Sequence, residues 1–169
     1  TLATSATSID ENAGTSLTLT ATLSNPTNAD VTVSLSTGGT GTEGTDYSTI
    51  SDITISAGST TGTASFTPTD DSIYEGDETA VVSISSVSGG SATESGTQSV
   101  TITINENESA PTVTLTTSAT SIDENSGSVL TLTATLSNAT TADVTVSIAT
   151  SGTATEGTDY TDGSGNIDD

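Results

Sequence analysis

Carboxylates are the only charged side chains in this protein, and they limit the chemistry that is open to it. Its 169 residues include 22 Asp and Glu but no Lys, Arg or His, so the formal net charge is -22. Without Cys, His or Lys the chain cannot form a zinc finger, a thiolate or imidazole-activated nucleophile, or a phosphate-gripping P-loop. Only cations from outside can balance its charge. A bound metal ion is therefore the first hypothesis.

The densest acidic segment covers residues 70–78, where Asp70, Asp71, Glu75, Asp77 and Glu78 place five carboxylates within nine residues. Two carboxylates about 5 Å apart repel each other by roughly 3 kcal/mol at an effective dielectric of about 20. Such a cluster opens unless a hard cation lies inside it. Calcium fits best, because the available ligand atoms are all oxygens. The alternative is a solvated acidic face without an ion.

The composition also argues against several classes of function. A strongly negative chain is repelled by nucleic acids and by anionic membrane surfaces. A glycosidase that uses a pair of carboxylates is the one realistic enzyme, but it would need aromatic platforms for a sugar. The chain has one Phe, three Tyr and no Trp. We therefore expect no enzymatic activity, no nucleic-acid partner and no direct insertion into a membrane.

The chain repeats itself at an interval of 113 residues. TSATSIDEN at Thr4 recurs at Thr117, LTLTATLSN at Leu17 recurs at Leu130, and TEGTDY at Thr42 recurs at Thr155. A period of this length corresponds to one whole domain, so the pattern predicts a tandem array.

We expect domain one to cover residues 1–108, with its first strand clipped at the N-terminus, and residues 110–169 to be the N-terminal half of a second copy. The other half of that copy is either cropped from a longer polypeptide or supplied as strands by a neighbouring chain.

The elements that must position the carboxylates are predicted from a hydrophobic period of two. Apolar residues alternate with Thr and Ser in a series of short segments, and turn signals such as Asn25-Pro26 and Gly89-Gly90 separate them. The segments are residues 17–23, 31–35, 53–55, 64–66, 80–84 and 100–104. This pattern predicts an all-β fold with essentially no helix. About seven strands would form an antiparallel immunoglobulin-like sandwich with Greek-key connections.

The last eight residues, 162–169, resemble an EF-type calcium loop only superficially, because the terminal Glu is missing at the expected spacing. A polar hairpin loop is the favoured interpretation of this segment.

Three motifs in a fixed order resemble the Calx-beta domain family. They are DENAG at Asp10, GTDY at Gly44 and DDSIYEGDET at Asp70. The resemblance covers domain one and the visible half of domain two. It implies a seven-stranded sandwich that binds calcium at one end.

The resemblance also implies which carboxylates bind the ion. The implied ligands are Glu11, Asp46, Asp70, Asp71, Glu75 and Glu78, with Glu106 as a further candidate and with Glu124 and Asp159 at the corresponding positions of the second copy. The Calx-beta domains of sodium–calcium exchangers tend to have further acids at two places where this chain has Ser72 and the linker Asn105-Glu106-Asn107-Glu108. The resemblance therefore implies fewer or more weakly bound ions here. A turn carboxylate that accepts backbone amides is the alternative role for Glu11 and Asp46.

Three functions follow as hypotheses. The leading one is a calcium-binding structural or adhesive repeat module of a long extracellular bacterial surface or matrix-fibre protein, in which calcium stiffens the domain array. Its partners would be calcium ions, neighbouring repeats or copies of itself, and cell-surface or matrix glycans or proteins. The alternatives are a calcium-sensing regulatory domain of a membrane or intracellular partner, and a filament subunit that strands of a neighbouring chain complete.

Overall fold

The computed structural model describes residues 1–161, 163 and 166–168, and the regular structure within them is β-strand throughout. None of these residues forms a helix long and apolar enough to cross a membrane. The chain divides into two compact units. Unit 1 comprises Thr1–Asp71 and Glu75–Glu108, and unit 2 comprises Ser72–Tyr74 and Ser109–Asp169.

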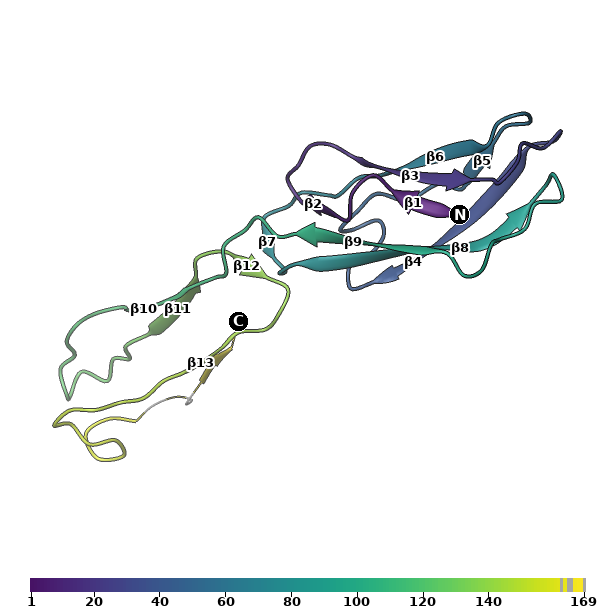
Figure 1. Cartoon of the computed structure of the whole chain (residues 1–169). Coiled ribbons are helices and arrows are strands. Elements are labelled where there is room, and N and C mark those ends of the chain that lie inside the picture. The colour runs from purple at the N-terminus through teal and green to yellow at the C-terminus, as the bar shows by residue number, and fades with distance from the viewer. Residues whose placement is uncertain (162, 164–165, 169) are drawn as a thin grey trace. The chain divides into compact units, whose positions relative to one another are not determined.

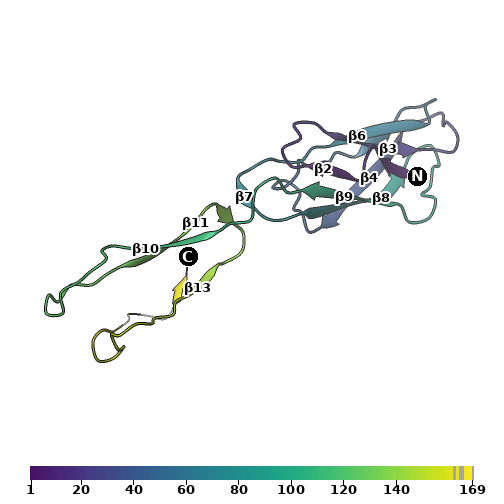
Figure 2. The same cartoon turned by 60° about the vertical axis from the view of Figure 1, so that its left-hand side comes forward.

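Unit 1 is a sandwich of two sheets (Figures 1 and 2). The smaller sheet has the order β1-β3-β6 and the larger has the order β2-β9-β8-β4-β5. Neighbouring strands are antiparallel, except that β2 runs parallel to β9. The strands are β1 (Leu2–Thr4), β2 (Ser8–Asp10), β3 (Leu17–Thr22), β4 (Val31–Gly39), β5 (Ile53–Ile55), β6 (Thr61–Phe66), β8 (Glu78–Ser88) and β9 (Ser99–Asn105). The predicted all-β, immunoglobulin-like sandwich is confirmed.

The alternation of the sequence places one side of each strand in the core. In β3, Leu19 and Ala21 are buried while the intervening Thr18, Thr20 and Thr22 lie on the outer side. The core is aliphatic apart from Tyr47 and Phe66, whose rings stack with their centroids 4.9 Å apart. The largest fully buried aliphatic side chains are Leu19, Val31, Ile53, Ile55, Val82 and Ile102. Threonine suits this arrangement because it is β-branched and its hydroxyl can face water.

The N-terminal segment, residues 2–10, is divided between the two sheets. Residues 2–4 pair with β3 in one sheet, whereas residues 8–10 pair with β9 in the other. Hydrogen bonds on both sides hold the crossing segment. Ser5 N–H donates to the Thr18 carbonyl, and Thr103 N–H donates to the Thr7 carbonyl, each at 2.9 Å. This division carries the chain from the smaller sheet to the end of β9, where Glu11 follows.

The described residues of unit 2 form three short pairs of strands. β10 (Val113–Thr117) and β11 (Leu132–Leu136) are antiparallel, β12 (Ala139–Thr140) is parallel to β7 (Ile73–Tyr74), and β13 (Thr145–Ser147) is antiparallel to β14 (Asn166–Asp168). The polar loop predicted for residues 162–169 lies partly outside the described residues. Within it, residues 166–168 form the strand β14.

Gly62 tests how closely the two sheets of unit 1 approach each other. A Cβ added at this position of β6 would lie 2.4 Å from the Thr54 carbonyl oxygen and 2.9 Å from Ile53 Cγ2. We expect Gly62→Ala to lower the free energy of unfolding by about 1–3 kcal/mol, the usual cost of overpacking. Chemical denaturation followed by circular dichroism measures this change.

Gly38→Ala is the matched control, because Gly38 also lies in a strand and a Cβ there would meet nothing within 4 Å. This variant should be as stable as the parent or slightly more stable, since alanine restricts the unfolded chain. Equal stabilities for the two variants would contradict the close approach of β5 and β6.

Candidate metal centre

The acidic end of unit 1 begins with Glu11, which follows β2. Glu11 is 8% exposed, and among the residues that the structure describes it is the only charged one that is buried. The parallel pairing of β2 with β9 fixes its position, because Glu11 N–H donates to the Asn105 carbonyl at 3.0 Å. The neighbouring carboxylate is held too, since Asn105 Nδ2 donates to Asp10 Oδ1 at 2.7 Å. The position of Glu11 therefore depends on β9, which is far from Glu11 in the sequence.

Asp46 lies in a tight loop between β4 and β5. Its carboxylate accepts the N–H of Thr42, and its own N–H donates to the Thr42 carbonyl at 2.9 Å. Gly44 closes the loop by donating to the Tyr47 carbonyl at 2.7 Å, with a φ of 89° that favours glycine. The next residue, Tyr47, is buried against Phe66. The core thus anchors the loop that presents Asp46.

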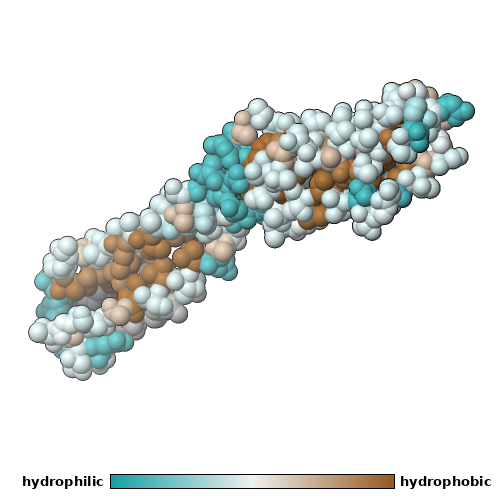
Figure 3. Space-filling view, in the orientation of Figure 1, coloured by the Kyte–Doolittle hydropathy of each residue, from teal (hydrophilic) through white to brown (hydrophobic). Residues whose placement is uncertain are grey.

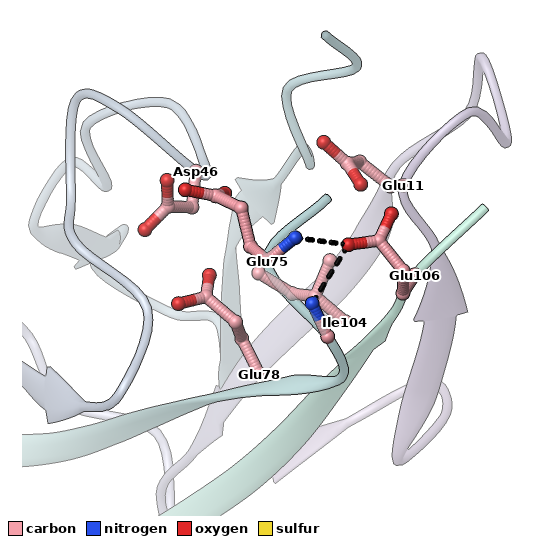
Figure 4. A pocket seen from close by; sticks show the side chains of 7 residues that line it. Glu11, Asp46, Glu75, Glu78, Ile104 and Glu106 are labelled. Atoms are coloured by element: carbon pink, nitrogen blue, oxygen red, sulfur yellow. Dashed lines mark hydrogen bonds between the residues drawn. The ribbon is translucent and has the colours of Figure 1, made fainter. Parts of the chain in front are cut away.

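Glu75 and Glu78 flank the start of β8, and their carboxylates meet that of Asp46. One ligand atom from each of these three residues lies within 4.8 Å of the other two. Figure 4 shows the three side chains converging on one pocket, with Ile104 of β9 and Glu106 among its other lining residues. Acidic residues thus make up most of the pocket lining, and Ile104 adds an aliphatic side chain.

Glu106 is the hub of the acidic end. Its Oε2 accepts the N–H groups of Glu75 and Gly76 at 2.6 and 2.8 Å, and its Oε1 accepts those of Asn107 and Glu108 at 2.9 and 3.0 Å. A carboxylate has about four lone-pair sites, so Glu106 can accept all four bonds. In this arrangement Glu106 ties the loop before β8 to the end of β9. One of its oxygens also lies within 4.8 Å of carboxylate oxygens of Glu11 and Glu108, so an ion bound there would share it with the backbone donors.

Glu108 completes a second acidic group with Glu11 and Glu106, whose ligand atoms also lie within 4.8 Å of one another. Among the described residues, Glu108 Oε2 is a buried oxygen with no hydrogen-bond partner, and the neighbouring Glu106 side chain raises the pKa of Glu108. Leaving a buried charged oxygen unsatisfied is costly. A hard cation in this group would remove that cost, so the residues present fit an oxygen-coordinated ion such as calcium.

Burial and carboxylate crowding raise most of the shifted pKa values at this end of unit 1, whereas backbone hydrogen bonds lower that of Glu106. Burial, together with the charge of Glu106, raises the pKa of Glu11 to about 7. Burial and the neighbouring Asp46 raise the pKa of Glu78 to about 7, and the same two causes raise that of Glu75. Burial alone would also raise the pKa of Glu106, but its backbone N–H donors lower it to about 2. Glu106 therefore stays ionised while its neighbours resist ionisation, which is the electrostatic environment a cation relieves.

The structure brings together five of the residues that the sequence analysis proposed as ligands: Glu11, Asp46, Glu75, Glu78 and Glu106, all of which line one pocket. Asp71 contacts the group through its backbone, which hydrogen bonds to Glu11. Asp70 is exposed and belongs to neither acidic group.

The two candidates in unit 2 are not part of such a group. Glu124 and Asp159 are both exposed, and the Asp159 carboxylate accepts the Thr155 N–H at 2.7 Å. In the described part of unit 2 no three acidic side chains come close enough to hold an ion.

Sequence reasoning missed Glu108. Its spacing carried a usable signal, because residues two apart in an extended segment point to the same side. Glu106 and Glu108 follow directly after β9 with this spacing. Asp77 was also not proposed as a ligand. Its carboxylate accepts the Glu106 N–H at 3.1 Å and so helps to hold Glu106 in place.

Comparison with known families accounts for almost the whole chain. Residues 1–107 match the model of the LapA domain, and residues 106–168 match that of the Calx-beta domain. The chain belongs to the LapA domain family. The match of residues 106–168 also confirms the predicted resemblance to the Calx-beta family, whose domains bind calcium.

Comparisons with solved structures and with curated proteins give less information than the family models. Two crystal structures, those of the calcium-binding domain CBD12 of CALX1.1 and of CBD12 from CALX1.2, share 19% sequence identity with this LapA-family chain. Each alignment covers 59% of this chain and 41% of the other, with a TM-score of 0.48. The chain thus spans less than half the length of these structures. No match was found among curated proteins.

The opposed pKa shifts predict how the stability of the calcium-free LapA unit depends on pH. The pKa values of Glu11 and Glu78 are raised from 4.5 to about 7, so their contribution is complete below about pH 4.5 and is lost as pH rises through 7. That of Glu106 is lowered to about 2, so its contribution is present above about pH 4.5 and is lost as pH falls toward 2. With a chelator present, the melting temperature should be highest near pH 5.

Thermal unfolding in chelator at about pH 3, 5 and 8 checks this profile. The Glu11→Gln, Glu78→Gln double variant separates the two carboxylates from the general relief of charge repulsion at low pH. It should lose most of the difference between pH 5 and pH 8. A melting temperature that is highest at pH 8 in the parent would contradict the assignment.

Proposed function

We propose that this chain is a non-catalytic, calcium-binding structural repeat of a long extracellular bacterial surface protein. The observation that carries the proposal is the pair of acidic groups at one end of unit 1, Glu11–Glu106–Glu108 and Asp46–Glu75–Glu78. Their ligand atoms come from four separate parts of the chain: Glu11, Asp46, residues 75–78 and residues 106–108. Calcium accepts six to eight oxygens in irregular geometry, and such a site can supply them.

The absence of cationic side chains supports calcium as a structural partner. A protein with Lys or Arg could pair its buried carboxylates internally, but this chain has neither. Binding a divalent ion to the folded state alone would stabilise the sandwich by mass action. Calcium would also favour the ionised forms of Glu11 and Glu78, whose pKa values are raised to about 7 in its absence.

The position of Glu106 and Glu108 in the chain supports a role for calcium in stiffening a domain array. Glu106 and Glu108 are the last acids of unit 1, and the main segment of unit 2 begins at Ser109. An ion held by Glu108 would fix the backbone that leads directly into the next repeat. The sequence copies spaced 113 residues apart and the match to the LapA domain, which suggests a surface adhesin, favour the extracellular, tandem setting.

A thermal-shift experiment tests whether the centre binds calcium. At a calcium concentration about 100 times the dissociation constant, binding adds about 2.7 kcal/mol to the stability of the folded state. For a domain of about 100 residues this raises the melting temperature by on the order of 10 °C. The rise should be lost in Glu75→Gln and Glu78→Gln, which remove ligands of the second group.

Glu94→Gln is the matched control for this experiment. Glu94 lies outside both acidic groups, and its carboxylate accepts the Gln98 N–H at 2.7 Å. This variant should keep the full calcium shift. If the parent shows no shift, the carboxylates form a solvated face and the proposed function fails.

Stiffening is a separate expectation with its own measurement. Nitrogen-15 relaxation of the full chain gives the rotational correlation time of each unit. With chelator the two units should tumble separately, and with calcium their correlation times should converge, because the ion fixes the connecting backbone. A chain whose melting temperature rises with calcium while its units still tumble independently would bind calcium without stiffening.

A further inference from the structure

Gly41 is a buried residue without a side chain at the acidic end of unit 1, where hydrophilic side chains gather (Figure 3). It lies between the end of β4 and Asp46. Its N–H donates to the Thr79 carbonyl at 3.0 Å, which holds it beside the start of β8. Gly41 is therefore next to the strand that begins with Glu78.

A side chain at position 41 would meet one group too closely. A Cβ there would lie 3.2 Å from Glu78 Oε2, which is tighter than an ordinary contact. Its distances to the Thr79 carbonyl oxygen and to Ile104 Cδ1, 3.5 and 3.6 Å, are those of ordinary van der Waals contact. Glu78 and Ile104 line the pocket (Figure 4), whereas Gly41 lies behind them. An added methyl group would therefore press the Glu78 carboxylate toward the other ligands.

The backbone at position 41 is held too firmly to withdraw from Glu78. The hydroxyl of the preceding residue, Thr40, accepts the Thr79 N–H at 2.8 Å, and the Thr40 N–H donates to the Thr79 hydroxyl at 3.3 Å. Together with the Gly41 N–H bond, these contacts join the end of β4 to the start of β8. The Glu78 carboxylate is the end of a flexible side chain, so it is the group that would move.

The second copy of the sequence shows that the loop itself does not require glycine at this position. Ala154 lies 113 residues after Gly41 and precedes the second TEGTDY segment. The loop after Ala154 is closed as in unit 1, because Gly157 N–H donates to the Tyr160 carbonyl at 2.7 Å. The backbone conformation thus accepts alanine, and the close contact of position 41 in unit 1 is with a carboxylate of the candidate centre.

We propose that Gly41 sets the ion-size selectivity of the Asp46–Glu75–Glu78 group by leaving the Glu78 carboxylate room to move outward. This inference rests on the calcium-binding function proposed above. Twice the usual metal–oxygen distance is about 4.6–5.2 Å for calcium but only about 4.0–4.2 Å for magnesium.

The three ligand atoms of this group lie within 4.8 Å of one another, so the larger ion needs the full width of the group. A methyl group behind Glu78 reduces that width. It would therefore weaken the binding of calcium more than the binding of magnesium, which changes specificity through a steric clash.

Isothermal titration calorimetry of the full chain with calcium and with magnesium tests the proposal. The relevant binding step is the one that Glu75→Gln abolishes. In that step Gly41→Ala should raise the dissociation constant for calcium by about fivefold or more and change that for magnesium by less than about twofold.

Gly38→Ala is the matched control, because it adds the same methyl group three residues earlier, where a Cβ would meet nothing within 4 Å. This control should leave both dissociation constants within about twofold of the parent. Thermal unfolding in chelator checks the fold of the test variant. Gly41→Ala should unfold within about 3 °C of the parent, because its backbone contacts are ordinary.

The other outcomes overturn the proposal in distinguishable ways. If the parent binds calcium and Gly41→Ala keeps the same preference for calcium over magnesium, this inference fails and the proposed function stands. The same preference together with a markedly lower melting temperature in chelator would mean that Gly41 serves packing alone. Absence of calcium binding by the parent would overturn the proposed function and this inference together.

Discussion

Repulsion between carboxylates at one end of unit 1 is the constraint on which the rest of the structure depends. The chain has no cationic side chain, so every acidic group brought into the sandwich must be stabilised by backbone dipoles, by a proton or by an ion. The protein uses backbone donors at Glu106, where four N–H groups hold one carboxylate. Glu11 and Glu78 have no comparable set of donors, and their raised pKa values express the remaining repulsion. An external cation is the stabilising group that the sequence itself cannot provide.

This constraint explains why the site is built from elements far apart in the sequence. Glu11 is placed by the pairing of β2 with β9, Asp46 by a loop anchored through Tyr47 in the core, and Glu106 by the end of β9. Each segment alone carries only a few acids. The groups converge only when both sheets have formed, so the cost of their repulsion is met by the hydrophobic core. Binding of an ion by these groups would therefore be linked to the folding of unit 1.

The sequence alone was sufficient to predict the fold class, because period-two alternation depends on local residue types. The six predicted segments appear as strands, including the buried Leu19 of β3 and Ile102 of β9. The division of the N-terminal segment, residues 2–10, between the two sheets could not be predicted. It depends on long-range hydrogen bonds such as that between Ser5 and Thr18.

The sequence also predicted the candidate site only in part, because its geometry depends on long-range contacts. Its acidic residues could be listed from a family pattern, but the list could not show that Asp70 is exposed or that Glu108 has an unpartnered buried oxygen. Those properties arise from where the chain turns after β9, which no local pattern encodes.

The two sequence copies separate local from long-range causes within one molecule. The TEGTDY loop folds in the same way in both units, with Asp46 bonded to Thr42 in one and Asp159 bonded to Thr155 in the other. That motif is therefore locally encoded. The DEN motif differs, because Glu11 is buried beside β9 whereas Glu124 is exposed, although their neighbours in sequence are the same.

Burial of this glutamate, and with it the raised pKa and the contact with Glu106 and Glu108, requires the partner strand rather than the motif. This glutamate therefore becomes a candidate ion ligand through the pairing of β2 with β9, which the local motif does not encode.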